Sequence, residues 1–397
     1  MLIQLTLFLF AGIFAGTITG LSPGIHINLV GAILVSLSTS LLSPILPIYL
    51  IVFIVAMSIT HTFVDFIPSI FLGAPDDADT GLSTLPGHEL LKEGKGYEAV
   101  MLSNYGSLIA VFILVIIAVP LIFIVPKVYP FLAKFMAFIL IFFSLTLIFL
   151  EKNKFSALFV FILTGLLGLG VLNLELKEPL LPLLTGLFGS SMLLLSIKQK
   201  TKIPSQKIDD DFKIPLKFPV IGSAIASPLC GFLPGLGGGQ AAIIGNQISK
   251  SDKKGFIVLI GITNTLVMGI SFLSLYAIQK ARTGSAVSIQ KILGNLSTQI
   301  LILILFVSLL SGILAFFITK NLSKLFAEKI DKINYSLLSI IVLIIISLVT
   351  LIFSGFSGFL VLIISTLTGI YCSSFNVKRT QFMGCLLLPT ILFYLGI

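Results

Sequence analysis

The sequence predicts an all-α polytopic membrane protein in which two halves of one chain repeat the same unit in inverted orientation. The 397 residues are 57% hydrophobic and only 10% charged, and no stretch is polar enough for a sizeable soluble domain. Apolar runs of about 20 residues, long enough to cross a bilayer as helices, recur from end to end. Pro23-Gly24 and Pro234-Gly235 interrupt these runs at corresponding points of the two halves.

Each half begins with an apolar region broken by Gly and Pro, which we expect to form two helical arms meeting at the Pro-Gly turn. These broken hairpins are residues 2–47 and 218–249. Because irregular backbone at membrane depth must be buried in protein or face a polar cavity, the two turns should share one cavity. Ten spanning helices are predicted besides them: 48–73, 97–125, 126–150, 155–172, 179–197, 255–278, 297–320, 333–353, 355–377 and 378–397.

The duplication is supported by three matches that occur in the same order in both halves. A single Pro-Gly motif would indicate only a kinked helix or a connecting loop, whereas ordered matches indicate a repeat. The repeats are therefore 1–197 and 218–397. The matched segments are Gly20–Gly24 with Gly231–Gly235 at an offset of 211, and Ile59–Thr62 with Ile262–Thr265 and Ala78–Gly81 with Ala281–Gly284 at an offset of 203.

The polar linker 198–217 separates the halves and carries six Lys. Basic segments remain on the cytoplasmic side, so we expect this linker to be cytoplasmic in a multi-pass protein of the cell membrane. Both termini then lie outside, and five spans per half make the halves inverted; if the hairpin arms also span, the count rises towards 14 and the inversion remains. The segment 279–291 does not fit, because it lies outside with three basic residues.

The Pro-Gly turns are the predicted substrate site. Helix N-termini attract anions and helix C-termini attract cations, and glycines let the backbone approach a ligand closely. Hydroxyl and amide side chains at the matched positions add a polar belt. The candidate substrate-binding residues are Ser22, Pro23, Gly24, His26, Asn28, Pro234, Gly235, Gly237, Gly238, Gln240, Thr263 and Asn264.

His61 and Asp65 are the candidate coupling residues. They lie four residues apart, so on a helix they share a face. A carboxylate inside a membrane is costly and is a functional hypothesis by default; it could carry a proton or bind Na⁺. The alternatives are an interfacial Asp65 satisfied by hydroxyls or water, and a His61 that only packs.

Three carboxylates, Asp76, Asp77 and Asp79, follow the first matched span. Asp79 corresponds to Arg282 in the repeat, and inverted halves would place the two loops on opposite faces. We therefore expect these residues to make the two entrances electrostatically different, and not to pair with each other. The alternative is an ordinary solvated loop.

Several other functions are not supported by the sequence. The three His are too far apart for a zinc site, and Cys230, Cys372 and Cys385 are scattered, so we expect no metal and no cofactor beyond the coupling ion. The net charge of +9 comes mainly from Lys between apolar runs, which argues against nucleic-acid binding. No nucleophile–base–acid order indicates an enzyme, although an intramembrane enzyme remains an alternative of a different class.

The turns carry a family resemblance. It rests on Gly20–Gly24, Gly73-Ala74-Pro75, Pro86–Ala99, Pro182–Gly189 and Gly231–Gly237. Together these segments resemble TctA, the large membrane subunit of tripartite tricarboxylate transporters, in a shorter archaeal branch. Ala74-Pro75-Asp76 stands where the family has Pro-Gly-Thr, and Pro86-Gly87-His88 where it has Asp-Gly, so a citrate-like polyanion is less certain.

The resemblance implies cation-coupled uptake of carboxylates together with a small membrane subunit and an extracytoplasmic binding protein. We therefore expect secondary active transport of a small organic anion driven by H⁺ or Na⁺; a homodimer is left open. A weaker similarity joins Gly20–Asn28 and Pro234–Gln240 to bacterial undecaprenyl-phosphate translocases. A lipid phosphate bound at a helix N-terminus, and hence a polyprenyl-phosphate carrier, is the alternative.

Overall fold

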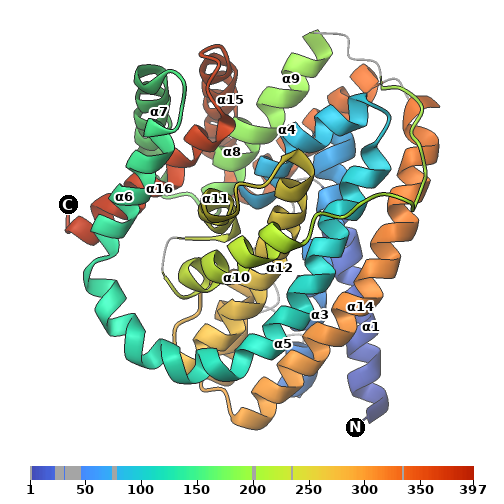
Figure 1. Ribbon diagram of the computed structural model, residues 1–397, viewed down its shortest axis with the longest axis vertical. Coiled ribbons are helices and arrows are strands. Elements are labelled where there is room, and N and C mark those ends of the chain that lie inside the picture. Colours follow the sequence, from blue (N-terminus) through green and yellow to red (C-terminus); the bar gives the residue numbers. More distant parts are fainter. Residues whose placement is uncertain are drawn as a thin grey trace.

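The computed structural model in Figure 1 describes residues 2–22, 31, 46–73, 78–198, 203–233, 236–332 and 335–397. Over these residues the regular structure is helical and contains no strand, which confirms the all-α prediction. Seven of the described helices are long and apolar enough to cross a membrane, and four shorter apolar helices accompany them. The chain is thus a multi-pass membrane protein.

The described elements of the two halves follow in the same order. Those of the first half are α1 (Leu2–Leu21), α3 (Pro47–Val64), the π-helix η1 (Pro68–Leu72), α4 (Ala78–Lys92), α5 (Gly96–Lys134), α6 (Met136–Phe149), α7 (Lys154–Leu172), α8 (Leu180–Leu184), the π-helix η2 (Thr185–Ser190) and α9 (Ser191–Lys198). Those of the second are α10 (Lys217–Phe232), α11 (Gly238–Ser249), α12 (Lys253–Ile278), α13 (Gly284–Leu293), α14 (Thr298–Lys329), η3 (Ile330–Lys332), α15 (Tyr335–Ser373), η4 (Arg379–Met383) and α16 (Gly384–Leu395).

Two predicted boundaries need correction, and one is confirmed. The predicted break between 125 and 126 is wrong, because α5 continues to Lys134 with Pro120, Pro126 and Pro130 inside it. Proline bends a helix without ending it when the surrounding packing holds the flanking turns. The segments 75–96 and 279–291, predicted as connections, contain α4 and α13. The predicted break near residue 354 is present, since Gly355 has non-helical angles of φ 69° and ψ −170° within α15.

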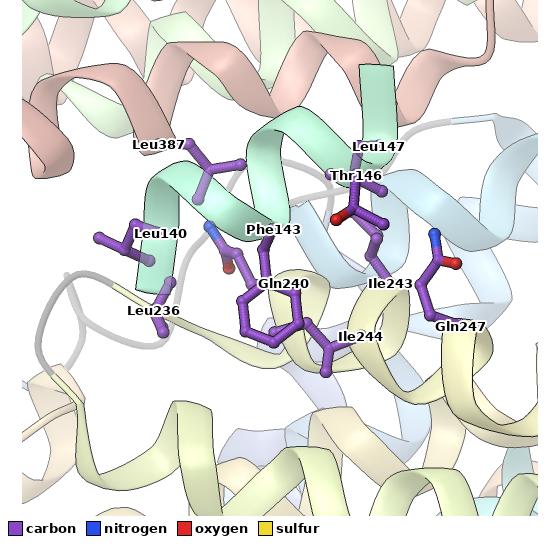
Figure 2. Close-up of a pocket in the computed structure, with 10 residues that line it drawn as sticks. All are labelled: Leu140, Phe143, Thr146, Leu147, Leu236, Gln240, Ile243, Ile244, Gln247 and Leu387. Atoms are coloured by element: carbon purple, nitrogen blue, oxygen red, sulfur yellow. The ribbon is translucent and has the colours of Figure 1, made fainter. Parts of the chain in front are cut away.

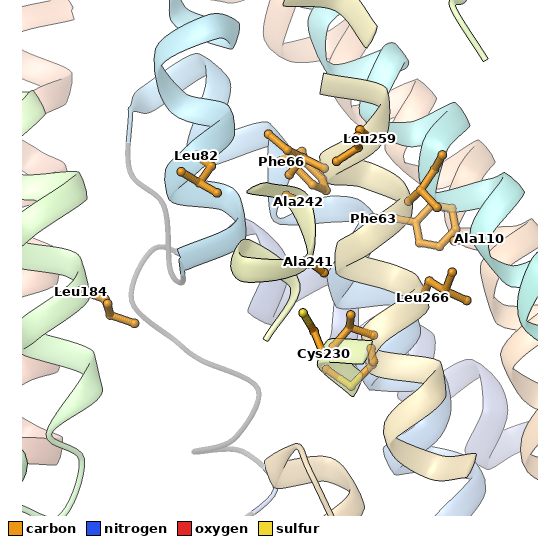
Figure 3. Packing of buried hydrophobic residues seen from close by; sticks show 14 of the residues in the cluster. Phe63, Phe66, Leu82, Ala110, Leu184, Cys230, Ala241, Ala242, Leu259 and Leu266 are labelled. Atoms are coloured by element: carbon orange, nitrogen blue, oxygen red, sulfur yellow. The ribbon is translucent and has the colours of Figure 1, made fainter. Parts of the chain in front are cut away.

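The core is built around α3 and α12, the helices that carry the matched Ile-Thr segments. Their membrane windows are each 94% buried, whereas the windows of the other five spans are 22–44% buried. Figure 3 shows apolar side chains gathered here, including Phe63 and Phe66 from α3 and Leu259 from α12, with Ala241 and Ala242 of α11 beside them. A helix buried on every side must be surrounded by other helices, so these two helices form the centre of the bundle.

The neighbours of α3 and α12 are exchanged between the halves. α1 packs on α3 and α10 on α12, while α5 of the first half packs on α12 and α14 of the second half packs on α3. At the contact of α3 with α12, the hydroxyls of Thr62 and Thr265 lie 3.0 Å apart, and the two residues are separated by the predicted repeat offset of 203. Equivalent residues meet only at an axis that relates the two units, so these threonines mark that position.

Contacts along the helices give their directions. On α5 and α12, Ser103 lies at Gly261 and Leu114 lies at Gly269, so these helices run parallel. On α3 and α5 the order is reversed, since the Ser107 hydroxyl approaches the carbonyl oxygen of Thr62 while Phe71 lies at Gly96. α3 and α12 therefore run in opposite directions.

A second group of helices lies to one side of this core in Figure 1 and comprises α6, α7, α8, α9, α15 and α16. Close glycine contacts hold it together. A Cβ at Gly168 of α7 would lie within 1.9 Å of the Cys385 carbonyl oxygen on α16, and one at Gly186 of η2 within 2.5 Å of the Ser365 side chain on α15. Both contacts join one half of the chain to the other.

The described part of the linker runs across the ends of α4, α5 and α14. The backbone N–H of Lys207 donates to the Gly94 carbonyl at 2.8 Å, and the hydroxyl of Tyr97 donates to Asp210 at 2.8 Å. Lys320 of α14 also donates to Asp210, at 2.7 Å. The hydrogen bonds from Lys320 and then Tyr97 hold the pKa of the Asp210 carboxyl below its usual value. The linker is thereby attached to both halves.

Candidate functional site

Many of the predicted substrate and entrance residues lie outside the described part of the chain. These are Pro23, Gly24, His26, Asn28, Asp76, Asp77, Pro234 and Gly235, together with the side chain of Asp79. That the two turns share one cavity, and that the aspartates form an entrance, therefore remain predictions. Ser22 ends the described part of α1, where its hydroxyl donates to the Ile18 carbonyl at 2.7 Å.

A buried polar cluster lies where α1, α3 and α12 meet. Asp65 is 2% exposed, and its Oδ2 accepts a hydrogen bond from the Asn264 amide at 2.9 Å. The Nδ1 atom of buried His61 lies 3.0 Å from the hydroxyl of Thr19 on α1. Thr62 and Thr265 complete the cluster, so predicted residues from both halves are brought together at the centre of the protein.

Asp65 occupies a break in its helix. α3 ends at Val64, and the π-helix η1 starts at Pro68 because proline lacks the N–H that a continuing α-helix requires. The carbonyl of Asp65 accepts a hydrogen bond from the hydroxyl of Ser69 at 2.7 Å, which replaces a regular helical bond. Short π-helical segments inside α-helices are frequent at functional sites.

The structure adds detail to the predicted coupling pair. His61 and Asp65 share one turn, with the backbone N–H of Asp65 donating to the His61 carbonyl at 3.0 Å, yet their side chains have described partners on two different helices, Thr19 and Asn264. Asn264 was predicted as a substrate ligand and not as the neighbour of Asp65. Thr19 was missed; the only signal was its position next to Gly20 in the matched motif. Thr263 bonds its own helix at the Ile260 carbonyl, 3.0 Å away.

The second predicted site lies at the N-terminus of α11. α10 and α11 run antiparallel, since Gly222 lies against Gly245. The backbone N–H of Gly237 donates to Oε1 of Gln240 at 2.9 Å and so caps the helix. Gln240 is 4% exposed, and its Nε2 has no hydrogen-bond partner in the described part of the chain. A buried amide donor beside a helix N-terminus favours an anionic or carbonyl oxygen.

Figure 2 shows Gln240 in a pocket between the first turns of α11 and α6. The cavity is about 20 Å³, which is room for one water molecule and not for an organic anion. A substrate could enter only if α6 and α11 moved apart. The pocket is lined by Leu140, Phe143, Thr146, Leu147, Leu236, Gln240, Ile243, Ile244, Gln247 and Leu387.

The predicted entrance residue Arg282 lies near a second cation and a tyrosine of α5. The hydroxyl of Tyr129 accepts hydrogen bonds from Arg282 at 3.1 Å and from Lys280 at 3.2 Å. Both cations also lie over the Tyr129 ring, 5.4 and 5.1 Å from its centroid. The basic residues that did not fit the predicted topology are therefore part of an ordered cluster, in which Tyr129 was missed from the sequence.

His88 of α4 gives a pH prediction. Burial lowers its pKa from an ordinary value of 6.5 to about 4, while a hydrogen bond to the Ile70 carbonyl acts in the opposite direction. Because the folded protein then binds fewer protons than the unfolded chain, stability should fall as pH falls from 6.5 towards 4. We expect the melting temperature to decrease over this window and the slope to flatten in His88→Gln. An equal slope in both proteins would contradict this role.

Comparisons with known proteins agree with these features. The sequence profile of the family described as "Tripartite tricarboxylate transporter TctA family" matches residues 6–384. An uncharacterised protein of Methanocaldococcus jannaschii is 36% identical over 405 aligned positions, which cover 98% of each chain. No solved structure matches the chain. The chain belongs to the tripartite tricarboxylate transporter TctA family.

Proposed function

We propose that this protein is a secondary transporter that carries a small organic anion, a carboxylate, and that the movement is driven by H⁺ or Na⁺. The proposal is carried by the buried cluster at the crossing of α3 and α12, where Asp65 meets Asn264 next to the paired threonines Thr62 and Thr265. A carboxylate at the centre of an apolar bundle is costly to keep charged, which suits a group that gains and loses a cation during transport.

Alternating access is proposed to follow from inverted repeats. The opposite directions of α3 and α12, and the exchange of their neighbours between halves, support the inversion. Segments assigned to one face also contact one another. On the proposed cytoplasmic face, Lys253 pairs with Glu89 and Lys320 with Asp210. On the other face, Arg282 contacts Tyr129, and the Ser354 hydroxyl donates to the Glu178 carbonyl at 2.9 Å.

The substrate carboxylate is proposed to bind at the N-terminus of α11. The helix end carries partial positive charge, and the Nε2 of Gln240 supplies a neutral donor without introducing a fixed cation. A small membrane subunit and an extracytoplasmic binding protein are proposed partners, in line with the family. The basic cluster of Lys280 and Arg282 would face such a binding protein.

This site can be tested with Gly237→Val. A Cβ at Gly237 would meet only the side chain of Gln240, at an ordinary 3.6 Å, so the fold should survive while the approach of a ligand to the backbone is blocked. We expect carboxylates to raise the melting temperature of the purified wild-type protein, and this response to be lost in Gly237→Val. Gly170→Val is the matched control, since nothing lies within 4 Å of a Cβ there.

Uptake into sealed proteoliposomes then tests transport itself. Carboxylate accumulation under a Na⁺ or H⁺ gradient is expected for the wild-type protein and for Gly170→Val, and not for Gly237→Val. Stabilisation by polyprenyl phosphates with no response to carboxylates would replace the proposal by the lipid-carrier alternative. Conversion of a ligand to product in detergent would indicate an enzyme.

A further inference from the structure

A second pocket lies at the opposite end of α11 from Gln240. It has a volume of about 70 Å³ and lies between the connection of α6 to α7, the last turns of α11, and the residues around the start of η4. Its polar lining consists of Glu151, Asn246, Gln247, Lys378 and Thr380, and its apolar lining of Leu147, Leu150, Ile243 and Phe256. It shares Leu147, Ile243 and Gln247 with the Gln240 pocket, so the two pockets adjoin along α11.

Glu151 is the buried charge of this pocket. It follows the end of α6 and is 9% exposed. Among the described residues its carboxylate makes no hydrogen bond and no ion pair, and Lys378, whose side chain also lines the pocket, is not within ion-pair distance. A carboxylate removed from water needs a positive partner, and the pocket is the place from which that partner can come.

The surroundings of Glu151 are oxygen donors. The side chains of Gln247 and Thr380 are half-buried and make no hydrogen bond within the described residues, so their oxygens are available to a ligand in the pocket. α11 ends at Ser249, so the pocket also faces the C-terminal turn of a helix, whose carbonyl groups carry partial negative charge. Carboxylate, hydroxyl, amide and carbonyl oxygens are the ligands preferred by hard cations.

We propose that this pocket is a monovalent-cation site of the Na⁺ class, with Glu151 as its one charged ligand and Gln247, Thr380 and the end of α11 as neutral ligands. One carboxylate balances one positive charge, which favours a monovalent over a divalent ion. α11 would then hold the substrate anion at its N-terminus and the cation at its C-terminus, each at the end whose partial charge attracts it.

The test is the melting temperature of the purified full-length protein, without substrate, in NaCl compared with choline chloride at equal ionic strength. We expect Na⁺ to raise the wild-type melting temperature in a saturable manner, because a ligand that binds only the folded state stabilises it. Glu151→Gln should abolish the rise, and Thr380→Val should shift it to higher Na⁺ concentrations. Glu175→Gln, at an exposed carboxylate, should respond as the wild type does.

The outcomes separate this site from the proposed transport function, on which only its role as a driving-ion site rests. If Glu151→Gln responds to Na⁺ as the wild type does, or if Asp65→Asn alone loses the response, the inference is wrong. If Glu151→Gln does not fold, Thr380→Val and direct binding of ²²Na⁺ to the wild-type protein decide the question; unaltered affinity in Thr380→Val overturns the site. A Na⁺ response without any carboxylate transport would contradict the proposed function and leave the cation site standing.

Discussion

Asp65→Asn should abolish ion-driven accumulation of substrate in proteoliposomes, while leaving substrate binding and exchange largely intact. Asparagine has nearly the shape of aspartate, and its side-chain oxygen can still accept the hydrogen bond from Asn264 that now measures 2.9 Å. The buried geometry between α3 and α12 is therefore kept. What is lost is the negative charge that binds a proton or a cation, so the gradient can no longer drive uptake.

The control for this prediction is Asp331→Asn, the same substitution at an exposed carboxylate in the short helix η3. Accumulation and exchange should be measured across a pH series, with and without a Na⁺ gradient, in both variants. We expect accumulation in Asp65→Asn to fall to the level of protein-free vesicles. If Asp65→Asn accumulates substrate at the normal rate at every pH, Asp65 is structural and coupling takes place elsewhere, with Glu151 as the next residue to test.

The repeat could be read from the sequence, but most contacts within it could not. The offset of 203 pairs Thr62 with Thr265, and the structure places their hydroxyls 3.0 Å apart. An internal alignment states that two residues are equivalent; it does not say that they touch, which requires that both lie on the axis. The bond from Asn264 to Asp65 was therefore not foreseen, although each residue is a candidate on sequence grounds.

Helix boundaries failed where tertiary packing overrides local rules. Pro126 predicted an end to its helix, yet α5 continues past it because neighbouring helices hold the flanking turns. The polar segments around His88 and Ser285 predicted connections, and they form α4 and α13. Both residues are buried against other helices, an environment that no local pattern reveals. Glu151 was missed for the same reason, because its pocket exists only once α6, α11 and η4 are assembled.

Gly261→Ala should be among the most destabilising single substitutions in the protein. A Cβ at this position of α12 would lie 2.2 Å from the carbonyl oxygen of Ser103 on α5, which is backbone and cannot rotate away. The helices would have to separate, weakening the bond from the Ser107 hydroxyl to the Gly261 carbonyl, now 3.1 Å. Overpacking of this kind costs about 1–3 kcal/mol. Gly106→Ala tests the same interface from α5, where a Cβ would lie 2.3 Å from the Val258 carbonyl oxygen.

The comparison that isolates this effect is Gly170→Ala, at a glycine inside α7 where a Cβ would have no neighbouring atom within 4 Å. Melting temperatures in detergent should fall clearly in Gly261→Ala and Gly106→Ala and stay at the wild-type value in Gly170→Ala, where alanine also favours the helix. Equal melting temperatures in all three would mean that α5 and α12 are not in close contact. Because Asn264 lies less than one turn from Gly261, separation of these helices should also move Asn264 away from Asp65. Gly261→Ala should therefore lose ion coupling at temperatures where the protein is still folded.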